Sequence, residues 1–326
     1  MSTLVLISLH LRGHNFNILR TLSYSSQPKR DFKKDLCKVV NVAIIGAPNA
    51  GKSTLINKIT ERKICAASNK VHTTTKLVRA ICFENDTQIV FLDTPGIVTE
   101  KEQKKYNLPD SMLAACQKSL RCADVIGVVH DISNKWTKDS LHNDVINMLE
   151  MVENIPSFLI INKVDMLKSK KQLLSIIRNL TNGAIAGNPI PNANKYKKIE
   201  ERENSKTRSL HYSSSEWSDQ TPEILIEEAV RAKFLDFLAQ EIPYNLKTQL
   251  EYFDDAKHDD KIICSVSVEC PTDRLARLIS GAGGGRLQQI KSHVRNDLID
   301  MFKKTVVIDI RLKVKSKAPS EESLRF

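Results

Sequence analysis

Apolar residues in the first half of the chain follow two alternating patterns. Short, mostly apolar runs predict strands over residues 40–45, 77–83, 88–92, 125–130 and 158–161. Amphipathic stretches predict helices over residues 53–62, 111–121, 139–153 and 170–180. Strands that alternate with helices are typical of a doubly wound, mostly parallel sheet. We therefore expect an α/β domain over residues 36–180.

The apolar periodicity stops at residue 181 and returns at residue 221. Asn, Lys, Ser and Glu dominate residues 181–220, which predicts a flexible basic linker. Thr221 and Pro222 suit the start of a helix that runs to about residue 240. Strands then follow over 245–253 and 261–269, helices over 272–279 and 286–302, and a last strand around Ile308–Val314. The order α-β-β-α-α-β predicts a second, α+β domain over residues 221–317, with a tail over 318–326.

The first 30 residues contain no Asp or Glu and are rich in Ser, and they carry Arg12, Arg20, Lys29 and Arg30. A basic, Ser-rich, acid-free leader is typical of a mitochondrial transit peptide. We expect a transit peptide and leader over residues 1–35, cleavage near Ser23 and a location in the mitochondrial matrix. The alternative is a disordered tail.

Composition indicates a basic protein and argues against a disulfide scaffold, a zinc site and a membrane span. The formal net charge is +11, so a polyanionic partner is plausible beside the alternative of a basic soluble protein. The seven cysteines include no C-x-x-C pair, which argues against a disulfide scaffold or a zinc site. No apolar run approaches the roughly 18 residues of a membrane span.

A glycine-rich turn joins the first predicted strand to the first predicted helix. Residues 46–53 match G-x-x-x-x-G-K-[ST], and the strand before and the helix after are the context that a P-loop requires. Lys52 is expected to reach the β- and γ-phosphates, and the Ser53 hydroxyl to bind Mg²⁺. The nucleotide-binding residues predicted here are Gly46, Ala47, Pro48, Asn49, Ala50, Gly51, Lys52, Ser53 and Thr54.

Two further motifs end later strands. In the D-T-P-G motif, Asp93 is expected to hold Mg²⁺ through water and the Gly96 N–H to sense the γ-phosphate. In the N-K-V-D motif, the Asp165 carboxylate matches N1–H and N2–H₂ of guanine and leaves adenine unmatched. GTP and GDP are therefore the predicted nucleotides, held at the base by Asn162, Lys163 and Asp165.

A threonine run between the P-loop and the D-T-P-G motif is expected to supply the remaining metal ligand. A threonine in a mobile loop can complete the Mg²⁺ shell when the γ-phosphate is present, and Thr74 is preferred to Thr73. The predicted catalytic residues are Lys52, Thr74, Asp93 and Gly96. The predicted metal ligands are Ser53, Thr74 and Asp93.

Together, the P-N-A-G-K-S-T loop, the H-T-T segment, D-T-P-G and N-K-V-D resemble the Era family of GTPases over roughly residues 40–315. The basic leader makes the chain most similar to the family's mitochondrial members. The resemblance implies a GTP-hydrolysing RNA chaperone for the mitochondrial small ribosomal subunit, with the 3′ region of small-subunit rRNA as partner. A monomeric state and a peripheral contact with the inner membrane are further expectations.

Hydrolysis is expected to be slow. Ile97 follows D-T-P-G, where a Ras-type enzyme carries the glutamine that positions water. The family resemblance implies hydrolysis without that glutamine and a potassium ion beside the phosphates, bound with the help of Asn49. We therefore expect a nucleotide switch rather than a rapid enzyme.

A second glycine cluster lies between two predicted helices of the α-β-β-α-α-β domain. A helix–G-x-x-G–helix turn lets a nucleic-acid backbone approach closely, and this order resembles the type II KH domain that ends Era proteins. Ala282-Gly283 stands where the family usually has a basic residue, which removes one expected phosphate contact. Arg295 lies near the expected path of the bases. The predicted RNA-binding residues are Gly281, Ala282, Gly283, Gly284, Arg286 and Lys291.

The fifth guanine-binding motif, Ser-Ala-x after a sixth strand, has no match between residues 181 and 220. The motif contributes mainly one backbone hydrogen bond, worth roughly 0.5–1.5 kcal/mol, or about tenfold in affinity. The fold is thus expected to lack the last strand and helix of a GTPase domain, to leave the edge of the fifth strand unpaired and to be less stable. The alternatives to the chaperone are a GTPase-impaired RNA-binding factor and a tRNA-modification GTPase.

Overall fold

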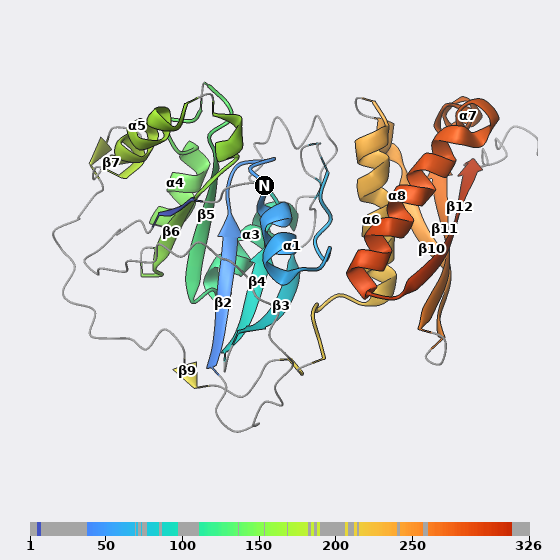
Figure 1. The fold of residues 1–326 in the computed structure, drawn as a ribbon, viewed down its shortest axis with the longest axis horizontal. Coiled ribbons are helices and arrows are strands. Elements are labelled where there is room, and N and C mark those ends of the chain that lie inside the picture. The colour runs from blue at the N-terminus through green and yellow to red at the C-terminus, as the bar shows by residue number, and fades with distance from the viewer. Residues whose placement is uncertain are drawn as a thin grey trace, which may run out of the picture. The chain divides into compact units, whose positions relative to one another are not determined.

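The computed structural model describes residues 5–7, 38–68, 70, 73, 77–84, 87–96, 111–135, 137–152, 154–167, 169–181, 184–185, 188–189, 206–207, 212–213, 215–239, 242–256 and 260–314. The chain divides into two compact units. Unit 1 comprises Met1–Thr60 and Thr74–Asp219, and unit 2 comprises Glu61–Thr73 and Gln220–Phe326. Each unit has its own sheet (Figure 1).

Unit 1 is built on a mostly parallel sheet, as the sequence predicts, with the strand order β1-β6-β5-β2-β4-β3. Strands β2, β4, β5 and β6 are parallel, and β3 is antiparallel to β4. The strands are β1 (Val5–Ile7), β2 (Lys38–Ile45), β3 (Val78–Glu84), β4 (Thr87–Asp93), β5 (Val125–Asp131) and β6 (Ser157–Asn162). The helices are α1 (Lys52–Thr60), α3 (Ser111–Cys122), α4 (Asn143–Glu150) and α5 (Lys170–Thr181), with a 3-10 turn η1 (Val164–Met166).

The central strands of unit 1 carry buried apolar residues. Ala43 and Ile45 of β2 and Leu159 and Ile161 of β6 are fully or almost fully buried. Buried parallel strands characteristically read as continuous apolar runs. All four residues belong to one core cluster, which holds the carboxyl ends of the strands in fixed positions.

The edge of β6, predicted to be unpaired, is in fact paired. Val5–Ile7 forms β1, antiparallel to β6, with Val5 opposite Ile161 and Ile7 opposite Leu159. The expectation failed because it considered only the segment that follows the fifth strand, whereas the pairing residues come from the leader. Between residues 181 and 220, the described strands are the two-residue segments β7 (Ala184–Ile185), β8 (Asn188–Pro189) and β9 (Lys206–Thr207).

The end of the predicted flexible linker also has defined contacts. Arg79 of β3 donates its backbone N–H to Asp219 Oδ1 at 2.9 Å, and its guanidinium pairs with Oδ2 at 2.8 Å. Ile81 N–H donates to the Trp217 carbonyl at 3.0 Å, and Gln88 donates to the Tyr212 carbonyl at 2.8 Å. The described residues 212–213 and 215–219 of the predicted flexible linker therefore have defined partners, because they satisfy polar groups of β3 and β4.

Unit 2 has the predicted order α-β-β-α-α-β, the topology of a type II KH domain. Its elements are α6 (Pro222–Phe237), β10 (Lys247–Ala256), β11 (Lys261–Cys270), α7 (Asp273–Ser280), α8 (Gly285–Phe302) and β12 (Thr305–Val314), with short turns η2 (Ile242–Asn245) and η3 (Ala282–Gly284). β11 is antiparallel to β10 and parallel to β12. Phe234 of α6, Val294 of α8 and Val266 of β11 are at most 1% exposed and lie in its core.

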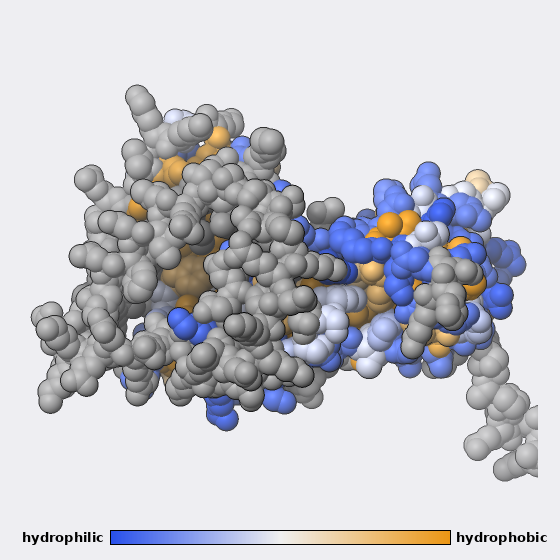
Figure 2. Space-filling view, turned by 60° about the horizontal axis from the view of Figure 1, so that its bottom comes forward, coloured by the Kyte–Doolittle hydropathy of each residue, from blue (hydrophilic) through white to orange (hydrophobic). Residues whose placement is uncertain are grey.

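The described surface of unit 2 is mainly hydrophilic, with small apolar patches, as the right-hand part of Figure 2 shows. Among the helices that the structure describes, none is both long enough and apolar enough to cross a membrane.

Candidate nucleotide and RNA-binding sites

The P-loop joins β2 to α1, and its two flanking glycines cannot be replaced without strain. Gly46 has φ +153°, and an added Cβ would lie 2.3 Å from the Val129 carbonyl oxygen. Gly51 has φ +95°, and its Cβ would lie 2.3 Å from Asn162 Nδ2. The loop is therefore packed directly against the ends of β5 and the N-K-V-D motif, as a close backbone approach requires.

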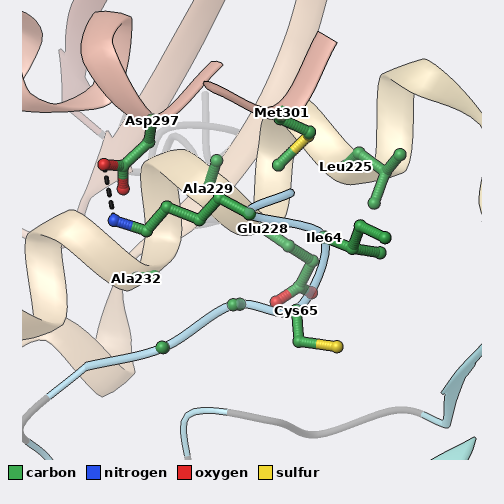
Figure 3. A pocket seen from close by; sticks show the side chains of 11 residues that line it. Ile64, Cys65, Leu225, Glu228, Ala229, Ala232, Asp297 and Met301 are labelled. Atoms are coloured by element: carbon green, nitrogen blue, oxygen red, sulfur yellow. Dashed lines mark hydrogen bonds and ion pairs between the residues drawn. The ribbon is translucent and has the colours of Figure 1, made fainter. Parts of the chain in front are cut away.

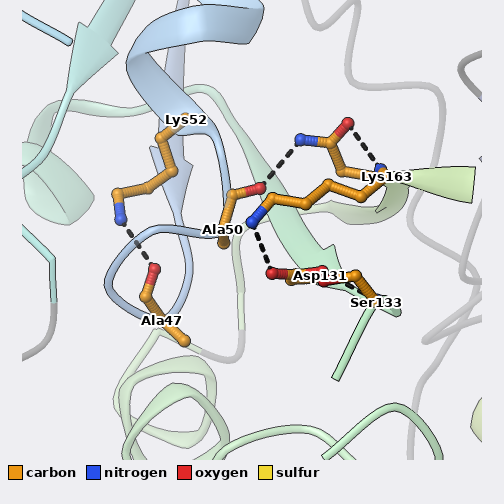
Figure 4. A network of polar contacts seen from close by, with 7 residues as sticks. Ala47, Ala50, Lys52, Asp131, Ser133 and Lys163 are labelled. Carbon is orange, nitrogen blue, oxygen red and sulfur yellow. Dashed lines mark hydrogen bonds and ion pairs between the residues drawn. The ribbon is translucent and has the colours of Figure 1, made fainter. Parts of the chain in front are cut away.

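Lys52 lies inside this loop. Its ammonium donates to the carbonyl oxygens of Gly46 and Ala47, each at 3.0 Å, and its side chain is buried (Figure 4). Burial lowers the pKa of Lys52, and the nearby Asp93 carboxylate acts in the opposite direction. A buried cation held only by neutral carbonyls would bind a phosphate oxygen more strongly, because both partners are then charged.

Two of the three predicted metal ligands, Ser53 and Asp93, are in contact. Ser53 Oγ donates to Asp93 Oδ2 at 2.7 Å, and Asp93 is completely buried at the end of β4. Mg²⁺ prefers such oxygen ligands, often through one or two carboxylates with substrate phosphates. The donor set of Ser53 and Asp93 therefore fits Mg²⁺.

The D-T-P-G backbone runs close to the P-loop. An added Cβ on Gly96 would lie 3.1 Å from Pro48 Cα. Thr94 donates to the Ile44 carbonyl at 2.7 Å, and Cys116 of α3 donates to the Pro95 carbonyl at 3.2 Å. Burial raises the pKa of Cys116 to about 11, so this thiol stays protonated and keeps its donor. The sequence did not reveal Cys116, because its partner is a backbone atom from a distant motif.

The N-K-V-D motif is attached to the P-loop. Asn162 Nδ2 donates to the Ala50 carbonyl at 2.8 Å, and Asn162 Oδ1 accepts the Lys163 N–H at 2.9 Å. Lys163 Nζ pairs with Asp131 Oδ2 at 2.6 Å (Figure 4). Asp165 is exposed in η1, so its carboxylate is open to a ligand.

Asp131, at the end of β5, is a further residue that the motifs did not reveal. Burial acts to raise its pKa, but hydrogen bonds from Lys163 and Ser133 outweigh it and lower the pKa. Asp131 is thus ionised at neutral pH and holds Lys163, which has a left-handed φ of +58°. This pair fixes the turn that presents Asp165.

Within the predicted threonine run, the structure describes Thr73 but not Thr74. Thr74 and Ile97 lie outside the described residues. Thr73 belongs to unit 2, where its hydroxyl lies 2.5 Å from Ser68 Oγ and donates to the Lys70 carbonyl at 3.0 Å.

The G-x-x-G loop of unit 2 is open to solvent and depends on glycine. Gly281, Gly283 and Gly284 have φ of +76°, +58° and +78°. A Cβ on Gly281 would lie 2.8 Å from Arg286 Cβ, whereas no atom lies within 4 Å of one on Gly283. Ala282 and Gly283 are exposed, so a nucleic-acid backbone can reach the turn.

The predicted basic residues around this loop differ in availability. Arg286 is exposed and donates to the Leu278 carbonyl at 3.0 Å. Lys291 pairs with Asp309 at 3.0 Å, and Arg295 donates to the Val306 carbonyl at 3.0 Å. Leu278, which the sequence analysis passed over, is 49% exposed beside the loop and offers an apolar contact for a base.

Comparisons with known proteins agree with this geometry. A family model described as 50S ribosome-binding GTPase matches residues 41–163. The mitochondrial GTPase Era of Danio rerio is 31% identical, covering 91% of this chain and 79% of the relative. GTPase Era of Histophilus somni strain 129Pt is also 31% identical, covering 87% of this chain and 94% of the relative.

Solved structures extend the similarity to both units. Era in complex with MgGDPNP and nucleotides 1506–1542 of 16S ribosomal RNA superposes with a TM-score of 0.68 at 26% identity, covering 86% of this chain and 95% of that one. A tyrosine-to-alanine variant of Aquifex aeolicus Era bound to GDP·AlF4⁻ gives the same values. Each match covers most of the chain, more than unit 1 alone contains.

Proposed function

Because the chain belongs to the Era family of GTPases, we propose that it is a GTP-controlled RNA chaperone that binds small-subunit rRNA and assists assembly of the mitochondrial small ribosomal subunit. The observation that carries this proposal is the combination of two sites in one chain: a P-loop attached to an N-K-V-D corner, and an exposed G-x-x-G turn. The similar Era structure that holds MgGDPNP and a 16S rRNA fragment supports both ligands.

Unit 1 hydrolyses GTP, and its residues have separate roles in binding the phosphates and Mg²⁺. Lys52 provides a buried positive charge for the phosphates, and Ser53 and Asp93 would hold Mg²⁺. Bound there, the ion neutralises charge that develops on the transferred phosphoryl group. The Gly96 N–H is proposed to sense the γ-phosphate, and the close approach of its backbone to Pro48 of the P-loop supports this role.

Two features of the hydrolysis step belong to the proposal. The rate without RNA is slow, because the residue after D-T-P-G is Ile97 and an isoleucine cannot orient water. Asn49, with a left-handed φ of +57° in the P-loop, is the residue proposed to help bind K⁺. A K⁺ dependence of the hydrolysis rate would test this assignment.

A mitochondrial location, a monomeric state and a peripheral contact with the inner membrane complete the proposal. The basic, acid-free leader and the relatives that are named as mitochondrial support the location, and we propose the matrix as the compartment.

The missing fifth guanine motif favours one second candidate, a GTPase-impaired RNA-binding factor. In the described part of residues 181–220, no strand exceeds two residues. The alignment with the Danio rerio relative spans 359 positions, more than the 326 residues of this chain, so the relative has positions that this chain lacks. The loss of one backbone hydrogen bond to guanine lowers affinity by about tenfold, which weakens but does not abolish nucleotide binding.

Binding of the full chain to labelled RNA tests the proposal. The RNAs are a 3′-terminal small-subunit rRNA fragment, the same sequence scrambled, and a tRNA, each with GDP or a non-hydrolysable GTP analogue. We expect tighter binding of the rRNA fragment than of the other two. Equal affinity for all three would contradict the rRNA assignment, and preference for tRNA would favour a tRNA-modification GTPase. GTP hydrolysis measured on the same preparation separates the chaperone from the GTPase-impaired factor.

A further inference from the structure

Two neighbouring elements of unit 1 hold the D-T-P-G motif where it leaves β4. The Thr94 hydroxyl donates to the Ile44 carbonyl of β2 at 2.7 Å, and the Cys116 thiol of α3 donates to the Pro95 carbonyl at 3.2 Å. The side chains of Thr94 and Cys116 are both buried. Water is thus kept away from the two hydrogen bonds, and in such surroundings a hydrogen bond is electrostatically stronger than at the surface.

The carbonyl that Cys116 contacts belongs to the same peptide group as the Gly96 N–H. A peptide group is planar and almost always trans, so its carbonyl and its N–H point in opposite directions within one plane. A hydrogen bond that fixes the Pro95 carbonyl therefore also fixes the direction of the Gly96 N–H. This N–H is the donor proposed above to sense the γ-phosphate.

The residues on either side of this peptide group do little to fix its orientation. The ring of Pro95 holds its own φ near about −65°, but it leaves ψ free. Gly96 has no Cβ and tolerates a wide range of φ. The peptide plane lies between these two freely rotating bonds, so it needs an anchor from outside the motif. Cys116 of α3 provides such an anchor.

The Cys116 thiol also lies among the groups of the nucleotide site. Burial is the main influence on its pKa and raises it to about 11. Lys52 and Thr94 act to lower this pKa, and the Asp93 carboxylate acts to raise it. The thiol therefore keeps its proton at neutral pH, and with it the ability to donate to the carbonyl.

The backbone of Gly96 is held close to the P-loop on the side where phosphates are expected. Gly96 is buried, and an added Cβ would lie 3.1 Å from Pro48 Cα and 3.3 Å from Pro48 Cγ. The peptide group is thus confined between the P-loop and the contact from α3. A change in its orientation would be felt directly at the P-loop.

We propose that Cys116 is a positioning residue of the nucleotide site, whose thiol holds the Pro95–Gly96 peptide group in the orientation that directs the Gly96 N–H to the γ-phosphate. This inference rests on the proposed GTP site. GDP has no γ-phosphate, so the thiol supports the binding of GTP and not that of GDP. Without the thiol, the peptide group must be ordered when GTP binds, and that ordering lowers the affinity for GTP alone.

The test is the ratio of affinities for a non-hydrolysable GTP analogue and for GDP, measured on the full chain with Mg²⁺. Cys116→Ala removes the donor and is expected to lower the analogue-to-GDP affinity ratio by about fivefold, the effect of one net hydrogen bond, with GDP affinity unchanged. Cys116→Ser keeps a hydroxyl that can donate to the same carbonyl, and its ratio is expected to stay close to wild type. These two variants differ only in that hydroxyl.

Further variants separate the hydrogen bond from packing. Cys116→Val fills the space without a donor, so it is expected to lower the ratio as Cys116→Ala does, and it replaces that variant if Cys116→Ala does not fold. Cys82→Ala removes a thiol of β3 outside the nucleotide motifs, and it is expected to leave the ratio unchanged. A packing role alone would lower the thermal midpoint of the variants and leave their ratios equal.

Three results would overturn the inference alone, provided that the wild-type chain binds GDP and GTP. They are an unchanged or raised ratio in the variants without a donor, an equal fall in Cys116→Ser and Cys116→Ala, and a similar fall in Cys82→Ala. Absence of GDP and GTP binding by the wild-type chain would overturn the proposed GTP site, and this inference with it.

Discussion

The nucleotide site of unit 1 and the proposed RNA-binding surface of unit 2 both contain a glycine turn before a helix, but the surroundings of the two turns differ. In the P-loop, Lys52 is buried, and an added Cβ on Gly51 would collide with Asn162. In the G-x-x-G turn, Gly283 is exposed and has open space around it. A small phosphate ligand is enclosed by backbone, whereas a polymer needs a surface that stays accessible along its length.

The charges of the two sites differ in the same way. The Lys52 ammonium is held by neutral carbonyls, so it is ready for a phosphate. On unit 2, Lys291 and Arg311 both pair with Asp309 and hold the pKa of its carboxyl low. RNA must share or replace these exposed pairs, each worth little, so loss of a single basic residue there has a smaller effect than loss of Lys52.

Lys52→Ala is expected to have the largest effect and to confine it to the nucleotide site. Removing the buried charge that meets the phosphates should weaken GTP and GDP binding by about 100- to 1,000-fold. Unfolding of the empty protein should change little, because Lys52 has no carboxylate hydrogen bond to lose and its burial is costly. Lys58→Ala, at an exposed position of the same helix α1, is the control, and comparable weakening in that variant would contradict the site.

Asp165→Asn is expected to change which base the site prefers, and not how strongly it binds the phosphates. An amide at this position cannot accept both guanine protons, so GTP affinity should fall by about 100-fold. The amide N–H can donate to the 2-oxygen of xanthine, so xanthosine triphosphate should bind better to the variant than to wild type. Competition titrations with the two nucleotides measure the change, and retained preference for GTP would show that another residue reads the base.

Gly283→Asp is expected to affect unit 2 alone. The position has a left-handed φ of +58° and open space, and Asp and Asn both tolerate that conformation. A carboxylate beside an RNA phosphate should lower rRNA affinity by about tenfold and leave GTP binding within about twofold. The matched variant Gly283→Asn has the same shape without the charge, so equal losses in both would argue against a phosphate contact.

Removal of residues 1–10 is expected to have the smallest effect, on unit 1 only. The deletion takes away β1 and leaves the β6 edge without Val5–Ile7. We expect a loss of roughly 1 kcal/mol in the unfolding free energy of unit 1, since a net backbone hydrogen bond is worth about that much. Removal of residues 318–326 is the control. An unchanged thermal midpoint would show that β1 contributes nothing, and cleavage of a leader near Ser23 would then have no structural cost.

The sequence predicted the parts of the molecule that depend on local patterns. The Gly51-Lys52-Ser53 loop, the parallel sheet and the α-β-β-α-α-β order follow from spacing and apolar periodicity. The contacts of Glu61–Thr73 with the rest of unit 2 were not predicted. Ile64 and Cys65 of this segment lie against α6 and α8, which come more than 150 residues later in the chain (Figure 3). Asp131 escaped notice for a similar reason, since its role depends on Lys163 from the neighbouring strand.

The segments that pair with the two edges of the sheet in unit 1 were also not predicted. The loss of a sixth strand predicted an open edge at β6, but a segment of the leader pairs there. Residues 217–219 likewise lie along β3, from a region whose polar composition suggested only a linker. Backbone hydrogen bonds require no particular side chain, so composition does not reveal which segment will pair with an edge.

The central claim is that this chain has a working guanine-nucleotide site, although residues 181–220 contain no Ser-Ala-x match to the fifth guanine-binding motif. The most direct test is displacement of a fluorescent GTP analogue from the full chain, with Mg²⁺ and K⁺, by unlabelled GTP and separately by ATP. The account predicts saturable binding that GTP reverses and that ATP, at a hundredfold higher concentration, does not. No binding, or equal displacement by ATP, would contradict it.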